Sequence, residues 1–151
     1  MRMLMLLALL VTPFATAGRA HAQTEAQRLQ QARDILARHP VFDGHNDLAW
    51  AIRNNVAAPL DVEAYDLRQR TPGHTDLQRL EAGGVGAQFW SVYLPGEIAD
   101  SGFARVQLEQ IDIARRFIEK YDAFELALTA DDVERIMRSG RVASLLGMEG
   151  G

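Results

Sequence analysis

The sequence has no cysteine among its 151 residues, and lysine occurs at a single position, Lys120. The absence of cysteine excludes disulfide bonds, thiolate zinc ligands, cysteine nucleophiles and a lipid-modified N-terminal cysteine. Sixteen Lys and Arg residues stand against 20 Asp and Glu residues, which gives a formal net charge of −4. This acidic balance argues against a nucleic-acid-binding protein that is held by a basic surface.

Long apolar runs are also missing from the sequence. The apolar run at residues 4–11 is too short for a membrane span, which needs about 20 residues. Together with the small residues at positions 20 and 22, this run predicts a signal peptide over residues 1–22. We therefore expect export of the mature chain, residues 23–151, to the periplasm or the outside of the cell, with no transmembrane span. An uncleaved membrane anchor and a mis-assigned start codon are the alternatives.

Hydrophobic periodicity predicts alternating helices and strands along the mature chain. A capping box at Thr24-Glu25-Ala26-Gln27 precedes the first expected helix, which is amphipathic. The expected helices cover residues 25–38, 48–54, 75–82, 103–121 and 131–138. The expected strands are rich in apolar and β-branched residues, as strands covered on both faces are, and cover residues 41–43, 85–94 and 142–148.

The alternation of strands and helices predicts an α/β fold with parallel strands. A complete (β/α)8 barrel takes about 250 residues. We therefore expect residues 23–151 to hold roughly the first three β/α units of a TIM-like barrel. The last expected strand has no helix after it to cover it, so the expected unit is the N-terminal part of a barrel, an incomplete domain.

Chemically useful side chains gather in the segment Asp43-Gly44-His45-Asn46-Asp47, directly after the first expected strand. Residues two apart in an extended chain point to the same face, so His45 and Asp47 would project together. An imidazole and a carboxylate placed in this way are two ligands for one divalent cation, and both suit zinc. The structural alternative is that Asp43 or Asp47 caps the following helix and His45 is an ordinary polar residue.

Glu149 is the second candidate for a functional carboxylate, because it follows the apolar strand expected at residues 142–148. A carboxylate at a strand end is costly to bury unless a cation or hydrogen-bond donors meet it. Barrel enzymes place catalytic groups at the carboxyl ends of their strands. The alternative is an exposed acid in a frayed terminal segment, and the position of Glu149 taken alone favours that alternative.

Three blocks of sequence resemble, in the same order, those of a known enzyme family. The blocks are residues 41–48 (VFDGHNDL), 84–93 (GVGAQFWSVY) and 142–151 (VASLLGMEGG). They are similar to the membrane dipeptidase (renal dipeptidase) family of zinc peptidases. The resemblance implies a (β/α)8-type barrel with two zinc ions at the carboxyl ends of its strands. By matching motif, His45 and Asp47 would bind one zinc ion, and Glu149 would bridge both.

The same resemblance implies metal-assisted hydrolysis of the peptide bond of a dipeptide. The family's two remaining zinc ligands are histidines, and they and the catalytic groups lie downstream of Gly151. We therefore expect residues 1–151 alone to be inactive and to be unstable or aggregate, because unpaired sheet edges would be exposed. The expected partners are a small dipeptide and, as a possibility, a second copy of the chain. The alternatives are a non-catalytic exported module that binds a metal or a peptide, and another metal-dependent hydrolase with its site between subunits.

Overall fold

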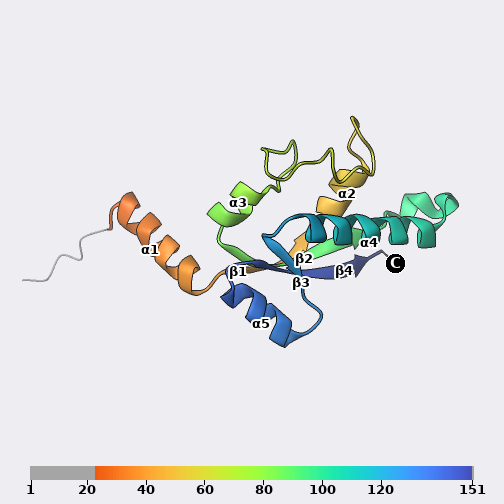
Figure 1. The fold of residues 1–151 in the computed structure, drawn as a ribbon. Helices are drawn as coiled ribbons and strands as arrows, with labels where there is room; N and C mark the ends of the chain where they lie inside the picture. The colour runs from red at the N-terminus through yellow and green to blue at the C-terminus, as the bar shows by residue number, and fades with distance from the viewer. Residues whose placement is uncertain (1–22, 151) are drawn as a thin grey trace, which may run out of the picture.

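The computed structural model describes residues 23–150, which form one sheet with helices on both faces (Figure 1). The expected signal peptide, residues 1–22, lies outside the described residues. The helices are α1 (Glu25–Arg38), α2 (Leu48–Arg53), α3 (Leu77–Ala82), the 3-10 helix η1 (Gly96–Ser101), α4 (Phe103–Lys120) and α5 (Ala130–Arg138). The strands are β1 (Val41–Asn46), β2 (Val85–Tyr93), β3 (Phe124–Leu126) and β4 (Val142–Glu149).

The sheet has four strands in the order β1-β2-β4-β3, and every neighbouring pair is parallel. This arrangement confirms the predicted α/β fold with parallel strands. The expected count of three strands was wrong, because the prediction missed β3. That strand pairs only with the first part of β4, from Phe124 opposite Val142 to Leu126 opposite Ser144. Three residues are too few to show a period of two, so the pattern analysis had no signal for β3.

Two cores hold the helices against the sheet. On the face covered by α2 and α4, Trp90, Phe117 and Phe124 pack edge to face and are fully buried. On the face covered by α5, Ile136 packs with Ala143 and other small side chains. The central strand β2 is therefore buried on both sides, as its apolar sequence predicts.

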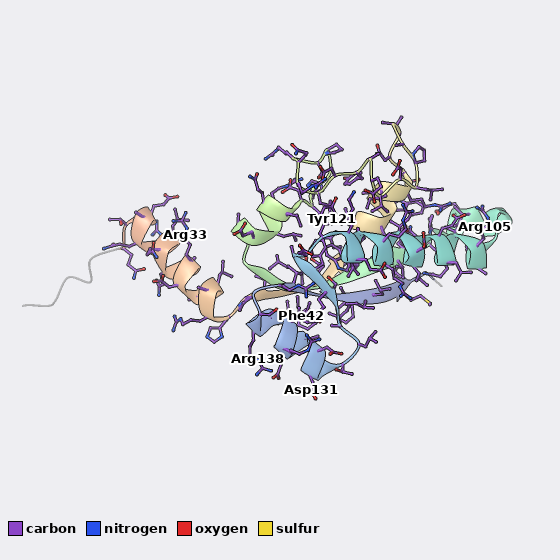
Figure 2. The ribbon with its side chains drawn as sticks, in the orientation of Figure 1. Arg33, Phe42, Arg105, Tyr121, Asp131 and Arg138 are labelled. Atoms are coloured by element: carbon purple, nitrogen blue, oxygen red, sulfur yellow. The ribbon has the colours of Figure 1, made fainter. Side chains whose placement is uncertain are left out.

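Helix α1 begins at the predicted capping box. The Thr24 side chain accepts a hydrogen bond from the backbone N–H of Gln27, whose side chain accepts one in return from the backbone of Thr24. The helix extends away from the sheet, and side chains such as Arg33 project from it into open space (Figures 1 and 2). No residue of α1 is buried. Within residues 23–150, no helix combines the length and the apolar character needed to cross a membrane.

Candidate metal centre

His45 lies in a one-residue bulge near the end of β1. Asp43 pairs with Gln88 of β2 and Asn46 pairs with Trp90, so β1 has one residue more than β2 between these two pairs. Bulges re-aim the side chains beside them and are common next to active sites. The irregular pairing therefore sets the direction in which the His45 side chain leaves the strand.

Asp47 has left the strand and stands at the N-cap position of α2, with φ −86° and ψ 29°. Its side chain makes no capping hydrogen bond. Instead, its Oδ2 atom lies 3.1 Å from Nε2 of His45. The Leu48 N–H donates to Oδ1 of Asn46 at 3.1 Å, so Asn46 serves the helix start. The alternative that the Asp47 side chain caps the helix is wrong. The expectation that His45 and Asp47 point the same way because they lie two apart in an extended strand is also wrong, since Asp47 lies outside the strand.

Glu149 reaches the same place from the end of β4. Its Oε2 atom lies 3.5 Å from Nδ1 of His45 and accepts a 2.9 Å hydrogen bond from the hydroxyl of Ser91 in β2. Its backbone carbonyl accepts from the Leu94 N–H at 2.9 Å, so it is an ordered part of the sheet and not a frayed acid. One potential ligand atom from each of His45, Asp47 and Glu149 lies within 4.8 Å of the others. Each of the three side chains is about half exposed, which leaves the cluster open to a ligand.

The charges of the cluster act on the His45 imidazole. The hydrogen bond and the negative charge of Asp47 raise the pKa of His45 above its ordinary value of 6.5. Burial opposes this rise, and the negative charges of Glu149 and Asp43 add to it. The cluster therefore favours positive charge at its centre. A metal ion that takes an imidazole nitrogen as ligand competes with a proton for that nitrogen.

The donor set fits a divalent transition metal. Zinc bonds of about 2.0–2.2 Å to nitrogen and oxygen place two ligands of one tetrahedral ion about 3.4 Å apart. The 3.1 Å separation between Nε2 of His45 and Asp47 is of this size. Glu149 faces the other ring nitrogen, at 3.5 Å from Nδ1, so its carboxylate would shift toward an ion bound at Nε2. Two carboxylates also neutralise the charge of a divalent ion.

Two cavities adjoin His45 and give a small molecule access to the cluster. One has a volume of about 240 Å³ and lies between His45 and Glu149, with Ser91 in its wall. The other has a volume of about 300 Å³ and is lined by His45, Asp47 and His74. His74 lies on the wall of this second cavity and is exposed.

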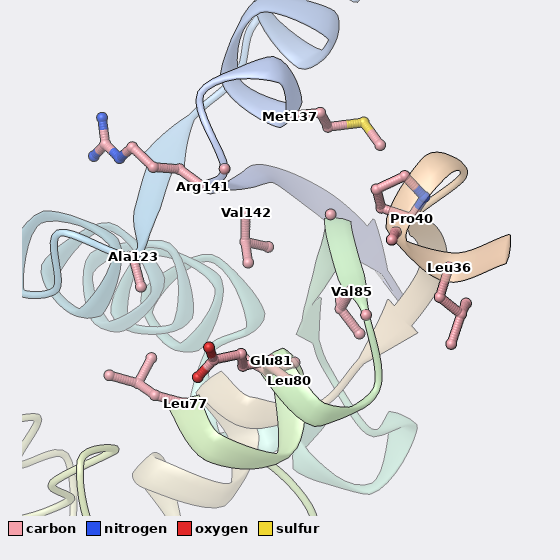
Figure 3. Close-up of a pocket in the computed structure, with 14 residues that line it drawn as sticks. Leu36, Pro40, Leu77, Leu80, Glu81, Val85, Ala123, Met137, Arg141 and Val142 are labelled. Carbon is pink, nitrogen blue, oxygen red and sulfur yellow. The ribbon is translucent and has the colours of Figure 1, made fainter. Parts of the chain in front are cut away.

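A larger cavity of about 520 Å³ lies at the opposite, amino-terminal end of the strands (Figure 3). Its walls include the apolar side chains of Leu36, Leu80, Val85 and Val142. Among residues 23–150, the one set of three potential ligands close enough for a single ion is the cluster at the other end of the sheet. The larger cavity therefore lies at the amino-terminal end of the sheet, whereas the potential metal ligands lie at the carboxyl end. We take the carboxyl end as the functional end because the potential ligands lie there.

Sequence reasoning missed three residues that support this cluster: Asn46, Gln88 and Ser91. Gln88 and Ser91 lie inside the apolar strand expected at residues 85–94. The available signal was polarity inside an apolar strand, since Gln88 is fully buried and Ser91 is 3% exposed. Buried polar groups are nearly always hydrogen-bonded, so such positions mark specific contacts.

A parallel α/β sheet with imidazole and carboxylate groups at the carboxyl ends of its strands defines a class, the metal-dependent enzymes built on barrel-type folds. A family model described as membrane dipeptidase (peptidase family M19) matches residues 29–151. The chain therefore belongs to the membrane dipeptidase family. The resemblance carried by the three sequence blocks is confirmed.

Curated relatives are dipeptidases, and they are longer than this chain. Dipeptidase verJ of Clonostachys rogersoniana is 40% identical over 133 residues, in a match that covers 81% of this chain and 34% of that protein. Dipeptidase 3 of Mus musculus is 40% identical over 122 residues, in a match that covers 81% of this chain and 24% of that protein. The chain thus spans about a third or less of the length of these relatives.

Solved structures of metallopeptidases share the fold. Dipeptidase AC, a metallopeptidase of family M19, matches with a TM-score of 0.56 and 27% identity, over 74% of this chain and 35% of its own. A metallopeptidase from Rhodobacter sphaeroides, solved with a phosphinate mimic of the dipeptide L-Ala-D-Ala, matches with a TM-score of 0.56 and 25% identity, over 74% of this chain and 38% of its own. These matches confirm the predicted fold class, since the sheet corresponds to part of a TIM-like dipeptidase fold.

Proposed function

We propose that this chain supplies metal ligands to an exported zinc-dependent dipeptidase, which hydrolyses the peptide bond of dipeptides. The observation that carries the proposal is the meeting of His45, Asp47 and Glu149 at the carboxyl end of the sheet. Membership of the membrane dipeptidase family supports it. The signal-peptide pattern of residues 1–22 supports export, and N-terminal sequencing of the exported protein should then begin at Gln23.

Each residue of the cluster has a distinct role in this proposal. His45 and Asp47 would hold one zinc ion, and Glu149 would be shared between that ion and a second one. Bound zinc would polarise the scissile carbonyl and lower the pKa of a water molecule. Ser91 holds the Glu149 carboxylate through a 2.9 Å hydrogen bond. A bridging carboxylate reduces the repulsion between two cations, which is large at short distance.

The size of the space around His45 supports a small substrate. The two adjoining cavities have volumes of about 240 Å³ and 300 Å³. The metallopeptidase from Rhodobacter sphaeroides was solved with a mimic of L-Ala-D-Ala. We therefore propose a short peptide, and L-Ala-D-Ala is the first substrate to assay.

The test measures zinc affinity and hydrolysis of L-Ala-D-Ala by the full-length protein and its variants. Asp47→Asn and Glu149→Gln each remove a charged ligand, so both should weaken zinc binding at least about tenfold and abolish hydrolysis. The control is Asp131→Asn. Asp131 is an exposed acid at the start of α5, on the face of the sheet opposite α2 and α4 (Figure 2), and its substitution should change neither zinc affinity nor hydrolysis.

Two results would contradict parts of this proposal. If neither Asp47→Asn nor Glu149→Gln weakens zinc binding, the cluster of His45, Asp47 and Glu149 is not the zinc site. Zinc binding by the wild type without hydrolysis of any dipeptide would contradict the enzymatic function and support the alternative of a non-catalytic binding module.

A further inference from the structure

We infer that Gln88, Asn46 and Thr75 are positioning residues that fix the bulge at the end of β1 and thereby aim His45 and Asp47 at the metal. The inference rests on the proposed function. It concerns three side chains that are not among the candidate ligands themselves.

Gln88 stabilises the bulge from the neighbouring strand. A bulge interrupts the ladder of backbone hydrogen bonds, and a buried carbonyl without a partner is costly. Gln88 is fully buried, and its Nε2 donates to the carbonyl oxygens of Asp43 at 3.2 Å and Phe89 at 3.1 Å. The Gln88 amide thus provides a donor to the carbonyl directly before the bulge.

A side chain also provides a hydrogen-bond partner for the backbone N–H group of His45, within the bulge. The backbone N–H of His45 donates to Oδ1 of Asp43 at 3.1 Å. Side chains therefore meet backbone polar groups on both sides of Gly44. The backbone that carries His45 is held in its irregular path by these specific bonds, and not by regular strand pairing.

Asn46 continues the same network into the start of α2. Its Oδ1 accepts from the Leu48 N–H at 3.1 Å and from the Thr75 hydroxyl at 3.2 Å. Its Nδ2 lies 3.0 Å from the Thr75 hydroxyl oxygen and 3.5 Å from Oε1 of Gln88. By serving the free N–H at the helix start, Asn46 leaves the Asp47 carboxylate available to face His45.

Thr75 fixes the network to a third segment. It is 8% exposed, and its backbone carbonyl accepts from the Thr71 hydroxyl at 2.7 Å. The next residue, Asp76, caps α3 by accepting from the Arg79 N–H at 2.8 Å. The loop before α3, β1 and β2 are therefore joined at Asn46, between the candidate ligands His45 and Asp47. A network that only stabilised the fold would not need to lie at this point.

The first test is Gln88→Leu in the full-length protein, a change that keeps the side-chain size and removes the amide. Loss of a residue that orients metal ligands typically costs about 10- to 100-fold in metal affinity, so zinc affinity should fall by that factor. The visible absorption of the Co2+-substituted protein should change as well, because that signal reports coordination geometry. Far-ultraviolet circular dichroism should remain that of the wild type.

The matched control for Gln88→Leu is Ser144→Ala. Ser144 pairs with Gln88 across the β2–β4 ladder and is equally buried. Its hydroxyl donates to the carbonyl oxygen of Val142, at the end of the sheet away from the cluster. This variant removes a buried polar group from the same sheet and should leave zinc affinity and the Co2+ spectrum unchanged.

A second pair of variants keeps the inference testable if Gln88→Leu does not fold. Thr75→Val removes the hydroxyl that contacts Asn46 at nearly constant volume, whereas Thr75→Ser keeps it. We expect Thr75→Val to bind zinc more weakly and Thr75→Ser to bind it like the wild type. Equal zinc affinity in the two Thr75 variants, or wild-type affinity in a folded Gln88→Leu protein, would overturn this inference alone. Absence of zinc binding by the wild type would overturn the proposed site and this inference with it.

Discussion

At the carboxyl end of the sheet, side chains from different segments hold the candidate ligands in place. The Asp47 carboxylate lies 3.1 Å from the His45 ring, and the Ser91 hydroxyl orients the Glu149 carboxylate. The cluster is half exposed, so its geometry depends on these partners and not on close packing. Hydrogen bonds to metal ligands fix their orientation and contribute to metal affinity.

Ser91→Ala tests this dependence at a single residue. The variant removes the 2.9 Å hydrogen bond to Glu149 while it changes the buried volume very little. We expect zinc affinity to fall about tenfold, because the carboxylate is then free to rotate away from the metal. Competition titration against a chromogenic chelator measures the change, with Ser144→Ala as the control. Identical zinc affinities for the two alanine variants would show that Ser91 does not position Glu149.

At the scale of elements, the helices were largely predictable because their signals are local. Helix α1 has the predicted bounds, and α5 begins one residue before the expected position 131, after a capping box formed by Thr129 and Asp132. Helix α3 begins at Leu77 and not at Thr75, because Asp76 is its N-cap and Thr75 takes part in the network with Asn46. The strand expected at 41–43 runs to Asn46 through the bulge.

The supporting contacts of the site could not be predicted from local patterns. The bond between Asn46 and Thr75 joins residues 29 positions apart, and the bond between Ser91 and Glu149 joins residues 58 positions apart. Periodicity describes neighbours along the chain, and these pairs depend on strand order and register. The three candidate ligands themselves were singled out by their residue types and their places after expected strands, and the resemblance to a known family then implied a zinc-ligand role for each.

The cap of α3 predicts a dependence of stability on pH. Asp76 is buried, and the hydrogen bond from the Arg79 N–H, followed by that from its guanidinium, holds the pKa of Asp76 below its ordinary value of 3.8. A folded-state pKa below the unfolded one gives stability that is present above about pH 3.8 and is lost as the pH falls toward the folded value. Melting temperatures should therefore fall with pH more steeply in the wild type than in Asp76→Asn. Parallel curves for the two proteins would contradict this account of Asp76.

The aromatic contact between α4 and the sheet predicts a large loss of stability. Phe117 is fully buried, with its ring centroid 5.0 Å from that of Trp90. We expect Phe117→Ala to lower the free energy of unfolding by about 3–5 kcal/mol. The control is Leu108→Ala on the same helix, where the side chain is 67% exposed and the change should be small. Urea denaturation measures both, and a similar loss in the two variants would contradict the assigned core.

At the scale of the whole molecule, large apolar side chains are uncovered on α1 and on the strands β1 and β4. Leu29 and Ile35 of α1 are 53% and 44% exposed, and Phe42 and Met148 are 50% and 67% exposed. Apolar patches of this kind promote association. We expect residues 23–151 expressed alone to self-associate as the concentration rises, as measured by sedimentation velocity. A monodisperse sample with one cooperative thermal transition would contradict this expectation.

The account depends most on the place where the molecule binds zinc. Crystals of the full-length protein with zinc, measured at energies above and below the zinc absorption edge, locate the ion directly. We predict an anomalous peak within about 2.0–2.2 Å of a His45 ring nitrogen and of carboxylate oxygens of Asp47 and Glu149. A zinc peak elsewhere, with Asp47 and Glu149 turned away from it, would contradict the account.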